Sequence, residues 1–190
     1  MKRFEELIER KKQGSLKVYL GYAAGTGKTY EMLQEGHRLQ KRGMDLVIGY
    51  VEPHMRPDTT ALTEGLERIP TKTVEIAGRS FPEMDIDAIL RRAPQIVLID
   101  ELAHSNASGS KHEKRYQDVL EILEHGINVI STLNVQHLES VAARVTEATQ
   151  APVQERLPDD VLRRADQVVV VDVTLEELRE RLRLGKIYDK

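Results

Sequence analysis

Short apolar runs rich in β-branched residues alternate with segments of helical periodicity along almost the whole chain. Because strands alternating with helices are typical of βαβ units, the pattern predicts an α/β domain with a mostly parallel sheet and helices on both faces. Most runs are continuously apolar, as expected of strands covered on both sides. The expected strands lie at 16–21, 46–51, 73–78, 95–100, 127–133 and 167–173. The expected helices lie near 28–42, 58–68, 85–93, 114–125, 136–149 and 175–184.

A chain of 190 residues is long enough for one compact domain with a proper core. Its formal charge of −3 gives no overall attraction to nucleic acid, and the lack of cysteine excludes disulfides, thiolate metal sites and a cysteine nucleophile. The opening segment has no apolar stretch like that of a signal peptide, and the run Val168–Val171 is far too short to span a bilayer. We therefore expect a single cytoplasmic domain over 1–190, with an N-terminal extension over 1–14, that neither binds nucleic acid nor inserts into a membrane.

The segment GTGKT, residues 25–29, stands where the first expected strand gives way to a helix. Glycines let backbone amides surround an anion, and the helix N-terminus adds its dipole and its N–H groups. In such a phosphate loop Lys28 reaches the β- and γ-phosphates of ATP, and the hydroxyl of Thr29 binds Mg²⁺. An ordinary glycine-rich turn is the alternative. The expected nucleotide ligands are Ala24, Gly25, Thr26, Gly27, Lys28 and Thr29.

Tyr22 departs from the usual spacing G-x-x-x-x-G-K-[ST], which has a glycine at this position. The amides expected to surround the phosphates come mainly from the stretch between Ala24 and Thr29. We therefore expect Tyr22 to change the path of the loop without abolishing nucleotide binding.

The run QIVLIDE places Asp100 and Glu101 at the carboxyl end of an expected strand, where ligands gather in an open α/β sheet. Asp100 is the expected partner of Mg²⁺, and Glu101 is the expected catalytic residue that orients or deprotonates an attacking water. Capping of a following helix is the alternative for both residues. At least one strand separates the two motifs in sequence, which resembles the ATPase branch of P-loop proteins, where an additional strand lies between the two motif strands.

A polar loop follows the acidic strand and carries several cations. We assign Arg115 to the nucleotide site, as a side chain that approaches the γ-phosphate, and Lys111 or Lys114 could do the same. A solvated connection into the next helix is the alternative. We expect no zinc site, because His104 and His112 have no acidic third ligand at metal spacing.

A second polar cluster ends the strand expected at 127–133 and comprises Thr132, Asn134, Gln136 and His137. Polar groups at this place could sense the γ-phosphate. They could equally cap the helix that follows, and we slightly favour capping.

Four stretches closely resemble the N-terminal cytoplasmic domain of the KdpD family, the osmosensitive potassium sensor histidine kinases. They read GYAAGTGKTYEML, VIGYVEPHMRPDTTALTEGLERIP, DAILRRAPQIVLIDELAHSNASGSKHEKRYQDV and GINVISTLNVQHLES. The resemblance continues through ERLPDDVLRRADQVVVVDVTLEELRERLRLGKIY and so covers 14–188. The alanine-rich loop without a glycine at position 22 is similar to that family's own form of the phosphate loop.

The resemblance implies an ATP-binding regulatory domain of P-loop NTPase-like fold. In that family the domain modulates the balance of kinase and phosphatase outputs in a two-component system that controls potassium uptake. The implied partners are a nucleotide with Mg²⁺ and the remainder of a sensor kinase or its response-regulator system, and a homodimer is one further arrangement. Neither a phosphoacceptor helix nor a catalytic ATP lid is recognisable, so we expect slow ATP hydrolysis at most. The alternative is a free-standing small P-loop ATPase or a kinase acting on a small acceptor.

Overall fold

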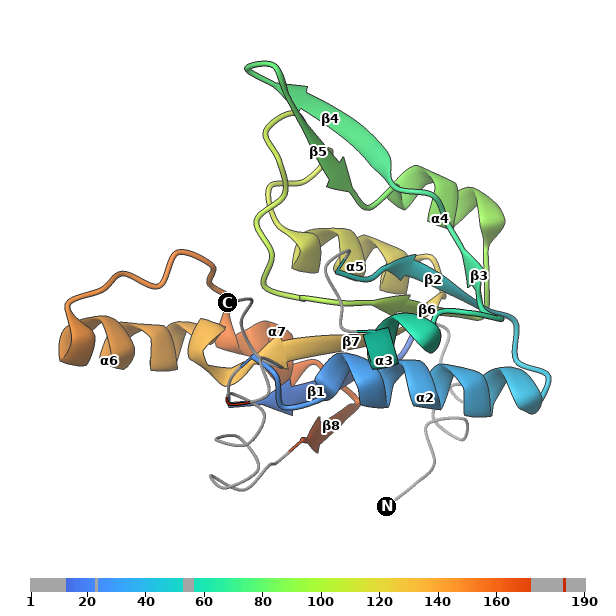
Figure 1. Cartoon of the computed structure of the whole chain (residues 1–190), viewed down its shortest axis with the longest axis horizontal. Coiled ribbons are helices and arrows are strands. Elements are labelled where there is room, and N and C mark those ends of the chain that lie inside the picture. The colour runs from blue at the N-terminus through green and yellow to red at the C-terminus, as the bar shows by residue number, and fades with distance from the viewer. Residues whose placement is uncertain (1–12, 23, 53–56, 172–182, 184–190) are drawn as a thin grey trace.

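The structure, a computed structural model, describes residues 13–22, 24–52, 57–171 and 183. It is built on a six-stranded sheet of order β3-β2-β6-β7-β1-β8, in which all neighbouring strands are parallel (Figure 1). The strands of this sheet are β1 (Leu16–Gly21), β2 (Leu46–Tyr50), β3 (Glu67–Arg68), β6 (Ile96–Ile99), β7 (Asn128–Asn134) and β8 (Gln167–Val170). The helices are α2 (Lys28–Lys41), α3 (Pro57–Ala61), α4 (Ile86–Arg92), α5 (Arg115–Glu124), α6 (Glu139–Thr149) and α7 (Asp159–Arg163), with the 3-10 turn η1 (Val135–His137).

Two apolar clusters lie on opposite faces of this sheet. Successive side chains of one strand point to opposite faces, so Val97 packs in one cluster and Leu98 in the other. Helix α2 covers the sheet face that carries Leu98, and its Met32 packs in that cluster. Helix α5 covers the opposite face, where its Val119 packs in the cluster of Val97. The predicted α/β class, with a mostly parallel sheet and helices on both faces, is confirmed.

Strand β7 lies between β1 and β6 in the sheet. Its residue Val129 pairs with Leu16 of β1 on one side and with Val97 of β6 on the other. The predicted additional strand between the phosphate-loop strand and the acidic strand is therefore present. Because the three strands are parallel, the connections that follow them leave the sheet at one edge.

The segment 73–78, expected as a strand of the main sheet, belongs to a separate hairpin. Here β4 (Lys72–Ile76) pairs in antiparallel fashion with β5 (Arg79–Glu83), and the hairpin projects away from the sheet (Figure 1). Its sequence explains the difference, because Val74 and Ile76 alternate with the exposed Glu75, whereas the inner strands β2 and β6 are buried along their whole length.

The helix expected over 58–68 is shorter than predicted. Helix α3 ends at Ala61, and Gly65, with a φ of 80°, precedes the short edge strand β3. A left-handed backbone at Gly65 is incompatible with a continuing helix.

Other predicted elements lie within three residues of their expected bounds, and α7 is an addition that the periodicity did not predict. The helix expected near 175–184 lies outside the described residues apart from position 183, and so do most of the predicted extension 1–14 and the last two residues of the strand 167–173. No helix in the described part of the chain combines the length and the hydropathy needed to cross a membrane.

Candidate functional site

The connection from β1 to α2 carries the segment predicted to hold phosphate. Gly27 is the N-cap of α2 with a φ of 97°, and Gly25 has a φ of 82°. Glycine tolerates these left-handed values at little cost. As an N-cap, Gly27 has no side-chain oxygen to offer the amides of the first helical turn. The N-terminus of α2 is therefore suited to receive an anion from outside the chain.

Lys28, the first residue of α2, folds back over this connection. The residue is only 8% exposed, and its Nζ donates to Thr26 Oγ1 at 3.2 Å. A Cβ added at Gly21 would lie 2.9 Å from Lys28 Cδ, so this glycine leaves the space that the lysine stem occupies. Burial lowers the pKa of Lys28 to about 8, although the charges of Asp100 and Glu101 act to raise it. A buried ammonium in this state gains from an anionic partner such as a phosphate.

Thr29 joins the two motifs that the sequence placed 71 residues apart. Its hydroxyl donates to the Asp100 carboxylate, with distances of 3.0 Å to Oδ1 and 3.1 Å to Oδ2. One hydroxyl and one carboxylate are hard oxygen ligands, a set that fits Mg²⁺ shared with phosphate oxygens better than a metal held by protein alone. Among the described residues, no group of three or more acidic, histidine or cysteine side chains lies at metal-binding distance.

Glu101 follows Asp100 with an unusual backbone conformation. Its φ is 56°, a left-handed value that a residue other than glycine keeps only when its surroundings fix it. Thr132 of β7 supplies part of that support, because its Oγ1 accepts the Glu101 N–H at 3.0 Å and donates to the Asp100 carboxylate. Although Glu101 is exposed as a residue, partial burial of its carboxyl and the charges of Asp100 and Glu52 raise its pKa to about 7.

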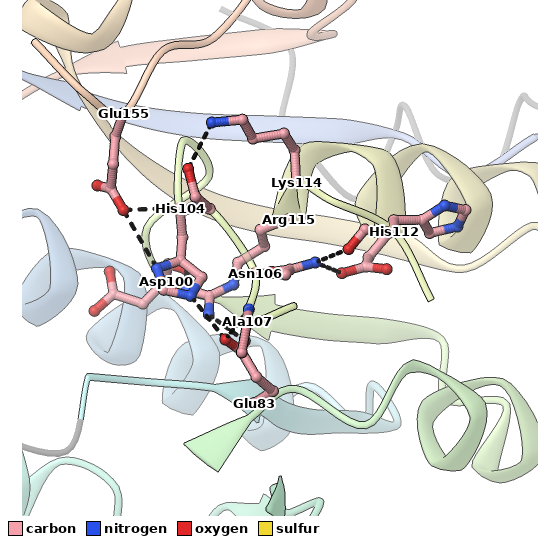
Figure 2. A network of polar contacts seen from close by, with 11 residues as sticks. Glu83, Asp100, His104, Asn106, Ala107, His112, Lys114, Arg115 and Glu155 are labelled. Carbon is pink, nitrogen blue, oxygen red and sulfur yellow. Dashed lines mark hydrogen bonds and ion pairs between the residues drawn. The ribbon is translucent and has the colours of Figure 1, made fainter. Parts of the chain in front are cut away.

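Arg115, predicted as a phosphate ligand, lies fully buried at the start of α5. Its NH1 donates to the backbone carbonyl of Asp100 at 3.1 Å, and its guanidinium lies 3.8 Å from the ring centroid of Tyr50. Its NH2 lies 3.7 Å from an oxygen of Glu83 (Figure 2). Contact between Arg115 and a phosphate stays a prediction.

The remaining cations of the loop after β6 also have protein partners. Lys111 Nζ donates to Glu121 at 2.6 Å. Lys114 Nζ donates to Ser105 Oγ at 2.5 Å, and Figure 2 shows this lysine. Ser105 and Lys114 form an isolated antiparallel bridge that closes the loop at its base. The loop is thus tied to its surroundings by side-chain contacts.

His104 lies between two carboxylates, a contact that no local sequence pattern predicted. Its Nε2 is 3.2 Å from Glu83 Oε1, and its Nδ1 is 3.4 Å from Glu155 Oε1 (Figure 2). Burial alone would lower the pKa of His104, but the hydrogen bonds to Glu155 and Glu83 raise it to about 9. Glu83 and Glu155 come from the hairpin and from the segment after α6, so only the tertiary fold brings them to the acidic strand.

The polar cluster after β7 does not cap the next helix, contrary to the interpretation we favoured. Helix α6 has Leu138 as its N-cap, without a side-chain cap bond. Thr132 lies in β7 and bonds to the acidic strand, as described above. His137 Nδ1 instead bonds to the carbonyl of Glu155 at 2.9 Å.

The chain matches known proteins over nearly its full length. A protein-family model described as "Osmosensitive K+ channel His kinase sensor domain" matches residues 12–190. The chain is 54% identical over 177 residues to "Sensor protein KdpD" of Mycobacterium tuberculosis and 51% identical over 176 residues to "Sensor protein KdpD" of Escherichia coli K12. Each alignment covers 93% of this chain but only 21% and 20% of those proteins, respectively, so the chain spans about a fifth of their length. The chain therefore belongs to the KdpD sensor-domain family.

Proposed function

We propose that this chain is a nucleotide-binding regulatory domain that takes ATP together with Mg²⁺. Within a longer sensor kinase, nucleotide occupancy would then modulate the balance of kinase and phosphatase outputs in a potassium-responsive two-component system. The observation that carries the nucleotide proposal is the contact of the Thr29 hydroxyl with both oxygens of Asp100. This contact brings the glycine-rich N-terminus of a helix next to the acidic end of a strand, at the carboxyl ends of the strands of a parallel sheet.

Each residue of this site has a distinct proposed role. The backbone from Ala24 to Gly27 surrounds the phosphates, and Lys28 pairs with the β- and γ-phosphates. Thr29 and Asp100 hold Mg²⁺, which when bound supplies neutralisation of phosphate charge. Glu101 orients or deprotonates a water molecule where hydrolysis takes place.

Calorimetric titration with ATP, ADP and GTP, each with and without Mg²⁺, tests the proposal. We expect saturable binding of ATP that strengthens when Mg²⁺ is present. Heats indistinguishable from dilution for all three nucleotides, on a sample whose circular dichroism shows a folded domain, would refute nucleotide binding.

Phosphate release, measured on the same sample, separates the regulatory domain from the alternative of a small ATPase. A regulatory domain binds ATP and turns it over slowly or not at all. If the parent releases phosphate steadily, Glu101→Gln should suppress release and keep binding, because glutamine preserves the shape of the side chain but cannot accept the proton. Release by Glu101→Gln at the parent rate would remove the proposed catalytic role of Glu101.

A further inference from the structure

Glu83 is a buried carboxylate on an otherwise exposed strand. It is the last residue of β5 and 4% exposed, whereas the four preceding residues of this strand are exposed to solvent. Its Oε1 accepts the backbone N–H of Ala107 at 2.7 Å and lies 3.2 Å from His104 Nε2. Its Oε2 accepts no hydrogen bond but lies 3.7 Å from Arg115 NH2, which is an ion-pair distance (Figure 2).

Two contact routes lead from Glu83 to the acidic pair. Through the first, Arg115 donates from NH1 to the backbone carbonyl of Asp100 at 3.1 Å. Through the second, the backbone N–H of His104 donates to the carbonyl of Glu101 at 3.0 Å. The backbone of each acidic residue is therefore held by a residue whose side chain is in turn held by Glu83.

We propose that Glu83 is a positioning residue for the Mg²⁺ end of the nucleotide site, acting on Asp100 through Arg115 and on Glu101 through His104. This inference rests on the proposed function. It assigns the β4–β5 hairpin, which lies outside the main sheet, a role in the geometry of the site.

The electrostatics explain why one carboxylate can have this effect. Arg115 is fully buried. Without a nearby carboxylate, the free energy that a buried guanidinium loses with its hydration shell exceeds the free energy of its remaining contacts. Burial alone would raise the pKa of Glu83, but the hydrogen bonds from His104 and Ala107 and the charges of His104 and Arg115 hold it below its ordinary value. Glu83 is thus ionised and attracts both cations, which keeps the left-handed backbone of Glu101 in place.

Coupling between two sites is reciprocal. If Glu83 fixes the Asp100–Glu101 backbone, then Mg²⁺ and ATP bound at that backbone should in turn stabilise the end of the hairpin at Glu83. The hairpin then reports on nucleotide occupancy without contacting the nucleotide.

The test compares Glu83→Gln with Glu75→Gln, a control on the exposed side of the same hairpin. The first measurement is amide hydrogen exchange over 100–107 without any ligand, and we expect about tenfold faster exchange in Glu83→Gln, as for loss of one charge-assisted contact. The second is Mg²⁺ titration at saturating ATP, where we expect affinity for Mg²⁺ to fall about tenfold, while ATP affinity in EDTA stays within about twofold. A role confined to stability of the fold would leave the Mg²⁺ affinity of the folded fraction unchanged.

Parent-like exchange and parent-like Mg²⁺ affinity in folded Glu83→Gln would overturn the proposal. If Glu83→Gln does not fold, His104→Gln decides, because it interrupts the route to Glu101 and should still accelerate exchange over 100–107. Parent-like behaviour of His104→Gln in both measurements then refutes the proposal. If the parent binds no nucleotide, the nucleotide proposal fails by itself, and the ligand-free exchange measurement still decides whether Glu83 positions the acidic pair.

Discussion

The connections β1–α2 and β6–α5 leave the same edge of the sheet, each linking a buried strand to a helix, yet they are built differently. The first connection lies between Gly21 and Lys28, turns at Gly25 and ends at the N-cap Gly27. Residues 100–114 form the second, in which side chains bond to each other and to neighbouring elements, as Asn106 does to Asp118 and Lys111 to Glu121.

The difference indicates a division of tasks between the two connections. A short connection that ends in a glycine N-cap offers backbone N–H groups and one lysine to an anion, because the N-cap has no side-chain oxygen for the first helical turn. A longer connection with many internal contacts is preorganised. Side chains that are already fixed lose little conformational entropy when a ligand binds beside them. Substitutions in the first should therefore change ligand affinity, and substitutions in the second should change stability and geometry.

The largest expected effect is the loss of stability on Arg115→Met. Arg115 follows the second connection directly, and its replacement removes one of the two cations beside the buried Glu83 carboxylate together with the bond to the Asp100 carbonyl. Removal of one partner of a buried ion pair costs up to about 3–5 kcal/mol, and His104 keeps part of the compensation. Urea denaturation of the ligand-free domain measures the change in the free energy of unfolding.

Arg92→Met is the matched control for this experiment. Arg92 contacts two carboxylates, those of Asp45 and Glu67, where Arg115 contacts one, but all three side chains are substantially exposed. Exposed ion pairs contribute little to stability, so the control should lose far less. Equal losses in the two variants would contradict the preorganised character of the second connection.

The next effect in size is the loss of ATP affinity on Lys28→Ala. Removal of a charge-assisted contact to the phosphates should weaken ATP binding by about 1.5–3 kcal/mol, and the melting temperature should change little. Lys41→Ala, at the other end of α2, provides a control with the same change of charge. Unchanged calorimetric affinity in Lys28→Ala would show that the first connection does not bind phosphate through this lysine.

Sequence patterns predicted the first connection well and the second only in outline. Local features, a strand followed by glycines and a helix, were enough to locate Lys28 and Thr29, because the geometry of such a junction is set by neighbouring residues. The partners of the second connection are Glu83, Tyr50 and Glu155, which have no local signature and come from three separate parts of the chain.

The fold shows the same limit. Continuous apolar runs identified the buried strands such as β6, because a strand that is covered on both faces has apolar residues at successive positions. The segment 73–78 has β propensity too, but it pairs with 79–83 and not with the main sheet. The choice between these two pairings depends on tertiary packing, which β propensity does not describe.

A smaller effect is expected in the pH dependence of stability on Glu101→Gln. The pKa of Glu101 is raised from 4.5 to about 7 in the folded chain by burial and by the charges of Asp100 and Glu52. Between these values the folded state binds more protons than the unfolded state, so this carboxyl lowers the free energy of unfolding as pH rises from 4.5 to 7.

Glutamine removes that contribution. The melting temperature of Glu101→Gln relative to the parent should therefore increase through this pH window and level off above it. Glu124→Gln, at the exposed end of α5, serves as the control and should show no comparable rise. A difference between Glu101→Gln and the parent that is the same at pH 4 and pH 8 would contradict the raised pKa.

The smallest effect is expected for Tyr22→Gly, although it restores the residue of the usual phosphate-loop spacing. Tyr22 is 65% exposed and, unlike Gly25 and Gly27, has no positive φ, so its backbone does not require glycine. ATP affinity should stay within about twofold, and stability should fall by about 0.5–1 kcal/mol because glycine loses more conformational freedom on folding. Gly27→Ala, which forces a Cβ onto a φ of 97°, should by contrast weaken ATP binding clearly. An affinity gain of about tenfold or more in Tyr22→Gly would contradict this expectation and show that the tyrosine restricts the loop. A gain of that size equals about 1.4 kcal/mol, which is what one additional hydrogen bond to the nucleotide contributes.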